Sequence, residues 1–110
     1  MKREISLGEF EMIVLAALLQ LDDRAYGMLV RREIERRSSR AVSIGAVYTT
    51  LNRLERKGYV SSQLGEPSPV RGGRAKRLFR IEAEGNRALL SSLRSLHRML
   101  DGLALEWGST

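Results

Sequence analysis

The stretch from Val42 to Val60, VSIGAVYTTLNRLERKGYV, predicts one amphipathic helix with a start signal, a stop signal and a strand after it. The Ser43 side chain can cap this helix by accepting a hydrogen bond from an early backbone N–H. Gly58 follows the last polar turn, where a left-handed residue usually ends a helix. At 100° per residue, the apolar positions fall within an arc of roughly 80°, which predicts a buried face. Its members are Ile44, Val47, Leu51 and Leu54.

The opposite face of the helix carries small, polar or cationic residues and no acid: Gly45, Thr49, Asn52, Arg53 and Arg56. The only acid of the helix, Glu55, lies near the buried edge. Small residues near the N-terminus and hydrogen-bonding residues further along suit insertion into the major groove of DNA. The alternative is the solvated face of an ordinary helix, and the surrounding chain distinguishes the two.

Positive charge is concentrated in the middle of the 110-residue chain, whose net charge is +6. Residues 24–80 hold fourteen Arg or Lys and four acids, a net charge of +10, whereas the rest of the chain carries −4. A surface that binds a polyanion needs this asymmetry. The chain has no cysteine, which excludes disulfides and thiol catalysis and fits a reducing compartment. The N-terminal residues lack an apolar signal core, so we expect a cytoplasmic protein.

Two helices are predicted before the opening stretch, over about Leu7–Leu21 and about Ala25–Ser38. The first is apolar nearly all round, so its second side requires a further neighbour. That side comprises Met12, Leu15 and Leu19. The second helix has a narrow apolar stripe that begins at Tyr26, and arginines cover much of the remainder. Two short helices, a tight turn and a third helix with a polar face form a helix-turn-helix.

A basic hairpin is predicted after the third helix, with strands over about Tyr59–Leu64 and Lys76–Ile81. Alternation along the second strand places Phe79 and Ile81 on one face. The long connection is rich in Pro and Gly, which resist regular structure. A basic hairpin directly after a DNA-reading helix is a wing. Its basic residues are Arg71, Arg74 and Lys76.

The last segment, about Ala83–Trp107, predicts a helix with a heptad seam. The seam comprises Leu89, Leu93, Leu96, Leu100, Leu103 and Trp107. Such a helix of some 25 residues is about 37 Å long, more than a small three-helix unit covers. We therefore expect it to pack on a second copy, beside Met12, Leu15 and Leu19; the alternative is folding back on its own domain. The expected fold is mainly α with a two-stranded β-wing, in which residues 1–82 form a winged helix-turn-helix and residues 83–110 a dimerisation helix.

Three motifs stand out: Tyr26-Gly27; Ser43-x-Gly45-x-x-Tyr48-x-x-Leu51-x-x-Leu54-Glu55-x-x-Gly58; and Gly72-Gly73-Arg74-x-x-x-x-Phe79-x-Ile81-x-x-Glu84-Gly85. In this combination the chain resembles the PadR-like transcriptional regulators, over most of the length from Leu7 to Leu90. The single C-terminal helix is similar to the short-tailed branch of that family.

The resemblance implies a winged helix-turn-helix dimer, usually a repressor that is released by a small aromatic or drug-like effector. It places the DNA-reading helix at Ser43 to Arg56, Tyr48 at the DNA backbone and the wing tip at Arg71 to Arg74. The chain departs from the family pattern at two positions. Thr49 stands where a proline is frequent, so base preference can differ, and Glu82 stands where a threonine commonly caps the last helix.

The sequence contains no constellation that predicts catalysis. His97 is the only histidine, so a histidine-based metal cluster is excluded and a catalytic triad would have to recruit it from the last helix. We expect no enzyme activity, no cofactor and no metal. The competing functions are a sequence-specific regulator, a non-specific nucleic-acid-binding architectural protein and a winged-helix protein-interaction module.

Three sets of residues carry these expectations. The residues expected at double-stranded DNA with a pseudo-palindromic operator are Tyr26, Ser43, Gly45, Tyr48, Thr49, Asn52, Arg53, Arg71, Arg74 and Lys76. The residues expected at a homodimer interface are Met12, Leu15, Leu19, Leu89, Leu93, Leu96, Leu100, Leu103 and Trp107. An effector cavity between subunits would use Met12, Leu15, Leu100, Leu103 and Trp107, because aromatic and methionine side chains suit planar apolar ligands; simple dimer packing is the alternative.

Overall fold

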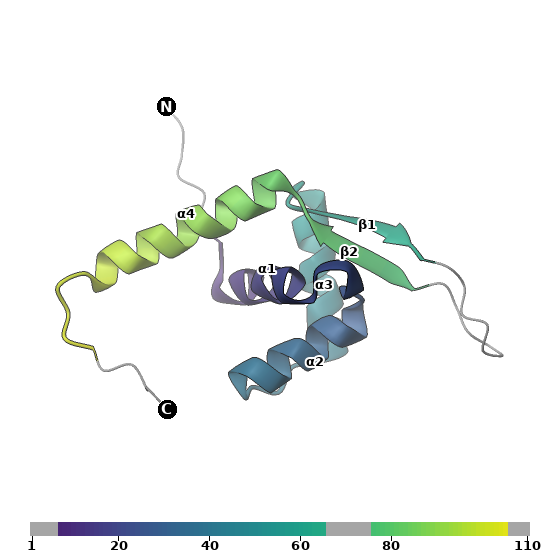
Figure 1. The fold of residues 1–110 in the computed structure, drawn as a ribbon, viewed down its shortest axis with the longest axis horizontal. Helices are drawn as coiled ribbons and strands as arrows, with labels where there is room; N and C mark the ends of the chain where they lie inside the picture. Colours follow the sequence, from purple (N-terminus) through teal and green to yellow (C-terminus); the bar gives the residue numbers. More distant parts are fainter. Residues whose placement is uncertain (1–6, 66–75, 106–110) are drawn as a thin grey trace.

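A helical body, a two-stranded antiparallel sheet and one projecting helix make up the structure, a computed structural model that describes residues 7–65 and 76–105 (Figure 1). In chain order the elements are α1 (Glu9–Leu21), the 3-10 turn η1 (Asp22–Arg24), α2 (Gly27–Ser38), α3 (Ile44–Arg56), β1 (Val60–Leu64), β2 (Arg77–Ile81) and α4 (Ala83–Leu100). The predicted fold class, mainly α with a two-stranded β-wing, is confirmed.

The core forms where α1, α2 and α3 meet the inner face of the sheet. Its fully buried side chains are Val14, Leu15, Val30, Val47, Leu51, Leu54 and Phe79. Each such side chain contributes roughly 1.5–3 kcal/mol through burial. The backbone N–H of Phe79 also donates to the carbonyl of Ala25 at 2.9 Å, so β2 is joined to the helical body by packing and by a backbone hydrogen bond.

The prediction that placed Leu15 on a free side of α1 was wrong. The side chain of Leu15 is fully buried in the core of its own chain, whereas Met12 is half-buried and Leu19 is 48% exposed. The reason is that α2, α3, α4 and β2 all contact α1. Together these four elements cover a wider arc of the α1 surface than two helices alone would cover. A partner molecule therefore has no surface of Leu15 to contact.

The ends of α3 follow the sequence signals. The Ser43 hydroxyl accepts a hydrogen bond from the backbone N–H of Ala46 at 3.0 Å, as an N-cap should. Gly58 has a φ of 81°, the left-handed conformation that favours glycine after a helix. The predicted buried face is confirmed at three positions, while Ile44 is half-buried and Thr50 is buried in addition.

Strand pairing gives the two faces of the sheet different neighbours. The register pairs Val60 with Ile81 and Leu64 with Arg77, so Phe79 and Ile81 share the face toward the helices, as predicted. Tyr26 forms an isolated antiparallel bridge with Leu78, on the opposite edge of β2 from β1. Burial falls along β1, from Val60 at 2% exposed to Leu64 at 64% exposed. The base of the sheet is therefore anchored in the core, and its outer part is not.

The last helix is shorter than predicted. It ends at Leu100, where Asp101 is extended and Gly102 has a φ of 81°, so α4 has 18 residues and a length of about 27 Å. Leu103 lies beyond the helix, and Trp107 lies outside the described residues. The extended 25-residue helix was wrong because Gly102 takes a helix-ending conformation.

The seam of α4 also has two parts. Leu89 is only 6% exposed and belongs to the core, which contradicts its assignment to a partner interface. Ser92 is buried beside it and accepts a hydrogen bond from the backbone N–H of Leu7 at 2.9 Å. From Leu93 onward no described residue of α4 is buried. Figure 1 shows this second half running away from the sheet and projecting past α1.

Candidate nucleic-acid interface

The predicted reading face of α3 is open to solvent. Gly45, Thr49, Asn52, Arg53 and Arg56 are all exposed, and an open hollow is lined by Thr49, Asn52, Glu55 and Arg56. Among the described residues, neither Arg53 nor Arg56 forms an ion pair with a carboxylate. The face therefore offers amide, hydroxyl and guanidinium groups, which are the groups that hydrogen-bond base edges and phosphates.

Tyr48 lies at the edge of this face and contacts α2. Its side chain is 36% exposed, and its ring centroid lies 6.3 Å from that of Phe79 in a tilted arrangement. A Cβ atom on Gly27 would lie 2.3 Å from ring carbon Cζ of Tyr48 and 2.4 Å from its hydroxyl oxygen. Gly27 thus makes room for the ring, which explains physically why the Tyr26-Gly27 motif accompanies this tyrosine.

A second hollow of about 610 Å³ lies between the start of α2, Tyr48 and the wing strands. Its lining residues are Tyr26, Met28, Leu29, Arg32, Tyr48, Leu64, Lys76 and Arg77. The ammonium group of Lys76 lies 5.7 Å from the ring centroid of Tyr26, a cation–π contact. The structure therefore brings three of the predicted residues together, namely Tyr26, Tyr48 and Lys76.

Sequence reasoning missed two cations of this hollow, Arg32 and Arg77. Strand alternation could have found Arg77, because it lies two residues before Phe79 and so on the same face of β2. Arg32 had a weaker signal, its place four residues after Met28 on α2. Ser43 and Gly45 are exposed at the start of α3, whereas the predicted wing residues Arg71 and Arg74 lie outside the described residues.

Most arginines of α2 are compensated by acids. Arg36 and Arg37 both donate to Glu33, and Arg31 lies 3.8 Å from Glu35. Hydrogen bonds from Arg37 and then Arg36 lower the pKa of Glu33 below its ordinary value. Arg32 forms no ion pair with a described carboxylate, so uncompensated charge lies toward the second hollow.

The C-terminal end of α3 is held against α1 by an ion pair. The ammonium of Lys57 donates to Oε2 of Glu11 at 2.8 Å, and the backbone N–H of Gly8 donates to Oε1 at 3.0 Å. Burial alone would raise the pKa of Glu11, but these two hydrogen bonds and the charges of Lys57 and Arg53 lower it overall. This contact joins the C-terminal end of α3 to the first turn of α1.

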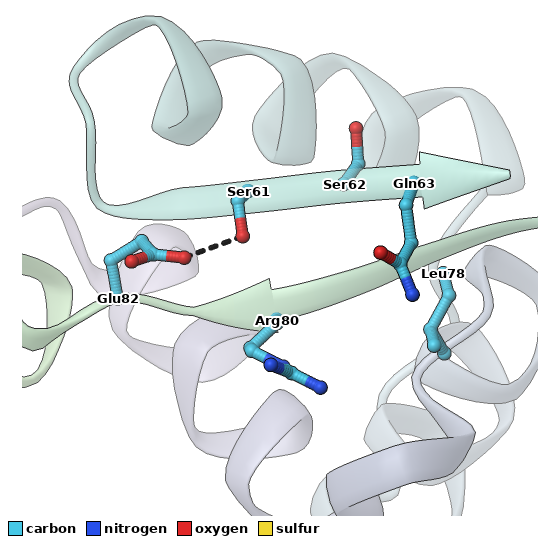
Figure 2. A pocket seen from close by; sticks show the side chains of 6 residues that line it. All are labelled: Ser61, Ser62, Gln63, Leu78, Arg80 and Glu82. Atoms are coloured by element: carbon cyan, nitrogen blue, oxygen red, sulfur yellow. Dashed lines mark hydrogen bonds between the residues drawn. The ribbon is translucent and has the colours of Figure 1, made fainter.

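Other hollows lie away from α3. Figure 2 shows one of about 80 Å³ on the outer face of the sheet, lined by Ser61, Ser62, Gln63, Leu78, Arg80 and Glu82. Another, of about 180 Å³, lies between α1 and α2 and is mostly apolar.

Within residues 7–65 and 76–105, no three His, Cys, Asp or Glu side chains gather as a metal ion would require. None of the helices in the same ranges has both the length and the apolar character needed to cross a membrane.

Comparison with known proteins agrees with this geometry. Residues 14–91 match the sequence profile of the transcriptional regulator PadR-like family. The transcriptional regulator Rv3488 of Mycobacterium tuberculosis (strain ATCC 25618 / H37Rv) is 35% identical over 78 residues, which cover 71% of this chain and 68% of that relative.

Two solved structures share the fold. A transcriptional regulator from Clostridium thermocellum superposes with a TM-score of 0.69 at 22% identity and 81% coverage of both chains. A PadR family transcriptional regulator from Eggerthella lenta DSM 2243 gives a TM-score of 0.70 at 22% identity, covering 84% of this chain and 76% of that one. The chain therefore belongs to the PadR-like family of transcriptional regulators, and it is a winged-helix DNA-binding regulator rather than an enzyme.

Proposed function

We propose that the protein is a homodimeric, sequence-specific repressor that a small aromatic or drug-like effector releases from DNA. The observation that carries the proposal is the exposed face of α3. That face presents Thr49, Asn52, Arg53 and Arg56, and neither arginine pairs with a described carboxylate; beside it lies a hollow lined by cations and tyrosines. Such a surface matches a negatively charged duplex with hydrogen-bonding groups in its major groove.

Within that surface the residues take different roles. Asn52 can bind adenine through two hydrogen bonds and Arg53 can do the same with guanine, while Thr49 can contact a base edge or a thymine methyl group. Tyr48 and Lys76, which line the same hollow, and Ser43 at the N-terminus of α3 contact the phosphate backbone and so set the register of α3 without reading sequence. Tyr26 and Gly45 complete the surface, the first as a wall of the hollow and the second by allowing close approach.

Dimerisation is supported by the apolar surface of α4. Leu93, Leu96 and Met99 are 45%, 49% and 76% exposed in a single chain, and Leu103 beyond the helix is 57% exposed. A group of exposed large apolar side chains of this kind is typical of an interface. We assign residues 83–110, Leu100 among them but without the buried Leu89, to the dimer contact. Met12 and Leu19 of α1 lie beside this contact in the proposed dimer, and the buried Leu15 does not take part. In such a two-fold dimer we expect the two α3 helices to lie about one duplex turn, roughly 34 Å, apart, which is the spacing of two half-sites.

An effector would bind between the subunits, against Met12, Leu100, Leu103 and Trp107. Met12 and Leu100 are half-buried in the single chain, which leaves apolar surface for a planar ligand. Fluorescence of Trp107, the only tryptophan, reports on this site. A change on titration with aromatic compounds supports the effector site, and no response from any compound favours simple packing. Because the chain is a transcriptional regulator, we place its action in the cytoplasm.

The test of base reading is Asn52→Ala compared with Asn86→Ala. Both asparagines are exposed on helices, but Asn86 lies at the start of α4, away from α3. We expect Asn52→Ala to lose about 1–3 kcal/mol of discrimination at one base pair and to bind random DNA as the wild type does. Asn86→Ala should match the wild type both in discrimination between base pairs and in affinity for random DNA. A uniform loss of affinity across sequences in Asn52→Ala would contradict base reading.

The same binding assay separates the alternatives. A non-specific architectural binder would bind its own upstream DNA and random DNA equally. A protein-interaction module would show no salt-dependent binding to either, against the expectation for a basic surface that contacts phosphates.

A further inference from the structure

An acid lies at the margin of the surface that is proposed to meet DNA. Glu55 is the only acidic residue of α3, it is half-buried, and it lines the same open hollow as Thr49, Asn52 and Arg56. A carboxylate so close to phosphates lowers affinity through charge repulsion. It therefore requires a role that offsets this cost.

The contacts of Glu55 point to the wing. Its Oε2 accepts a hydrogen bond from the Ser62 hydroxyl of β1 at 2.8 Å. The same hydroxyl oxygen accepts from Nη1 of Arg77 in β2 at 2.7 Å. Because a serine has one proton, donating it to Glu55 leaves the oxygen lone pairs for Arg77, and the two hydrogen bonds strengthen each other. One chain of hydrogen bonds thus joins α3, β1 and β2.

The position of these hydrogen bonds along the wing determines which part of the wing they can hold. The base of the sheet is held by buried Val60 and Phe79, whereas Leu64 at the outer end of β1 is 64% exposed. Beyond Ser62 the described strands have no buried side chain on this face to anchor them. Figure 2 shows Ser62 pointing to the opposite side of β1 from Ser61, away from Glu82. The outer wing therefore depends on polar contacts for a fixed angle.

We propose that Glu55 is a positioning residue that, through Ser62 and Arg77, fixes the angle between the wing and the DNA-reading helix. The two parts then meet the duplex as one rigid unit, so that sequence discrimination by α3 includes the phosphate contacts of the wing. The charge of Glu55 weakens binding to any DNA, and its tether strengthens binding to the correct site. This inference rests on the proposed DNA-binding function and adds a determinant of specificity to it.

The test uses serine variants that differ only in the side of β1 they affect. Ser62→Ala breaks the tether and leaves the charge of Glu55 in place. Ser61→Ala is the matched control, because the Ser61 hydroxyl donates to Glu82 on the other face of the same strand (Figure 2). Circular dichroism establishes that both variants fold.

The first readout needs no DNA. We expect backbone amides of β1 and β2 to exchange with deuterium at least about threefold faster in Ser62→Ala than in the wild type, and Ser61→Ala to show no such increase in the outer strands. Equal exchange in the two serine variants would overturn the tether.

The second readout is the ratio of affinities for the protein's own upstream DNA and for random DNA. We expect Ser62→Ala to lower this ratio by about three- to tenfold, which is the range for the net contribution of one ordinary hydrogen bond. Glu55→Ala should lower the ratio similarly while raising affinity for random DNA. The double variant Glu55→Ala, Ser62→Ala should have an affinity ratio no lower than that of either single variant. Additive losses would contradict a shared role.

A different outcome would assign Glu55 to base reading, since a carboxylate can accept from cytosine N4. In that case Glu55→Ala changes preference at one base pair, Ser62→Ala does not, and the positioning role is rejected. If the wild type shows no preference for its upstream DNA, the proposed function fails, and the exchange experiment alone decides whether the tether exists.

Discussion

Gly27 and Tyr48 show how single residues set the geometry of the surface. The motif residues were recognisable in the sequence, but their contact was not, because 21 positions separate them. In the structure the missing Cβ of Gly27 leaves space for the Tyr48 ring, which then lies beside Phe79. A local pattern therefore predicted which residues matter, and only the packing of α2 on α3 revealed the reason.

Gly85 has a similar role at the start of α4. A Cβ at this position would lie 2.2 Å from the carbonyl oxygen of Tyr59, an atom that also accepts the backbone N–H of Glu82 at 2.8 Å. We expect Gly85→Ala to destabilise the protein by about 1–3 kcal/mol through overpacking against backbone. Urea unfolding measures the loss. Gly45→Ala is the control, because the added methyl group there meets only the Ser43 hydroxyl at 4.0 Å; equal stability of the two variants would contradict the account.

Glu11 makes folding stability depend on pH. Its pKa lies below the ordinary value of 4.5, so its stabilising contribution is complete above that value and is lost as the pH falls through the lowered folded-state pKa. At pH 7 we expect Glu11→Gln to lower the free energy of unfolding by about 1 kcal/mol, because Lys57 loses a charged acceptor. The difference in free energy of unfolding between the wild type and the variant should disappear in acid.

Chemical denaturation at pH 7 and at about pH 3 measures this gap. Glu9→Gln is the control, since Glu9 pairs with Arg40 at 3.1 Å on the surface, with side chains 72% and 41% exposed. It should cost no more than about 0.5 kcal/mol at either pH. A gap for Glu11→Gln that is constant with pH would mean that the carboxylate does not stabilise the fold by its charge.

At the scale of elements, the helices with local signals were predictable and the arrangement around α1 was not. The cap and the glycine stop of α3 are local, and both are confirmed. Leu15 is fully buried in a helix that contacts α2, α3, α4 and β2, and no local sequence period contains these long-range contacts. Likewise a heptad pattern alone does not reveal that Gly102 takes a positive φ and that the helix ends at Leu100.

The wing makes a separate prediction about affinity. Arg71 and Arg74 lie outside the described residues, and their proposed role rests on the concentration of positive charge in the sequence between β1 and β2. We expect the double variant Arg71→Ala, Arg74→Ala to lose affinity for every DNA sequence and to lower the salt slope of binding by about 2.

Arg36→Ala, Arg37→Ala removes the same charge from α2, where both arginines bind Glu33, and serves as the control. Titrations at several salt concentrations compare the two. A salt slope that is the same in both double variants would count against a role of the wing at phosphates.

At the scale of the whole molecule, the exposed leucines of α4 predict that two copies of the chain associate, because a single chain leaves these side chains exposed to water. Leu96 is 49% exposed in the middle of this surface. Leu96→Glu would place a charge in the proposed interface. We therefore expect the dissociation constant of the dimer to rise at least about a hundredfold, because the charge would be buried without a partner. Sedimentation equilibrium measures the change. Arg94→Glu, exposed on the other side of α4, should leave the oligomeric state unaltered, and a monomeric wild type would refute the interface.

The fold class and the exposed polar face of α3 followed from the sequence because they rest on periodicity and helix caps. Other features of the surface needed the structure, since the contact between Tyr48 and Gly27 and the chain from Glu55 to Arg77 join residues of different elements. The proposed DNA site is a composite of α2, α3 and the wing, and the sequence identified the parts more readily than their relative placement.

The most direct measurement is a nuclease footprint of the wild-type protein on the DNA upstream of its own gene, with random DNA as competitor. We expect one protected region with two related half-sites whose centres lie about 34 Å apart, bound on the order of a thousandfold more tightly than random DNA. Protection spread evenly along the fragment, removed equally well by random DNA, would contradict sequence-specific binding by a dimer.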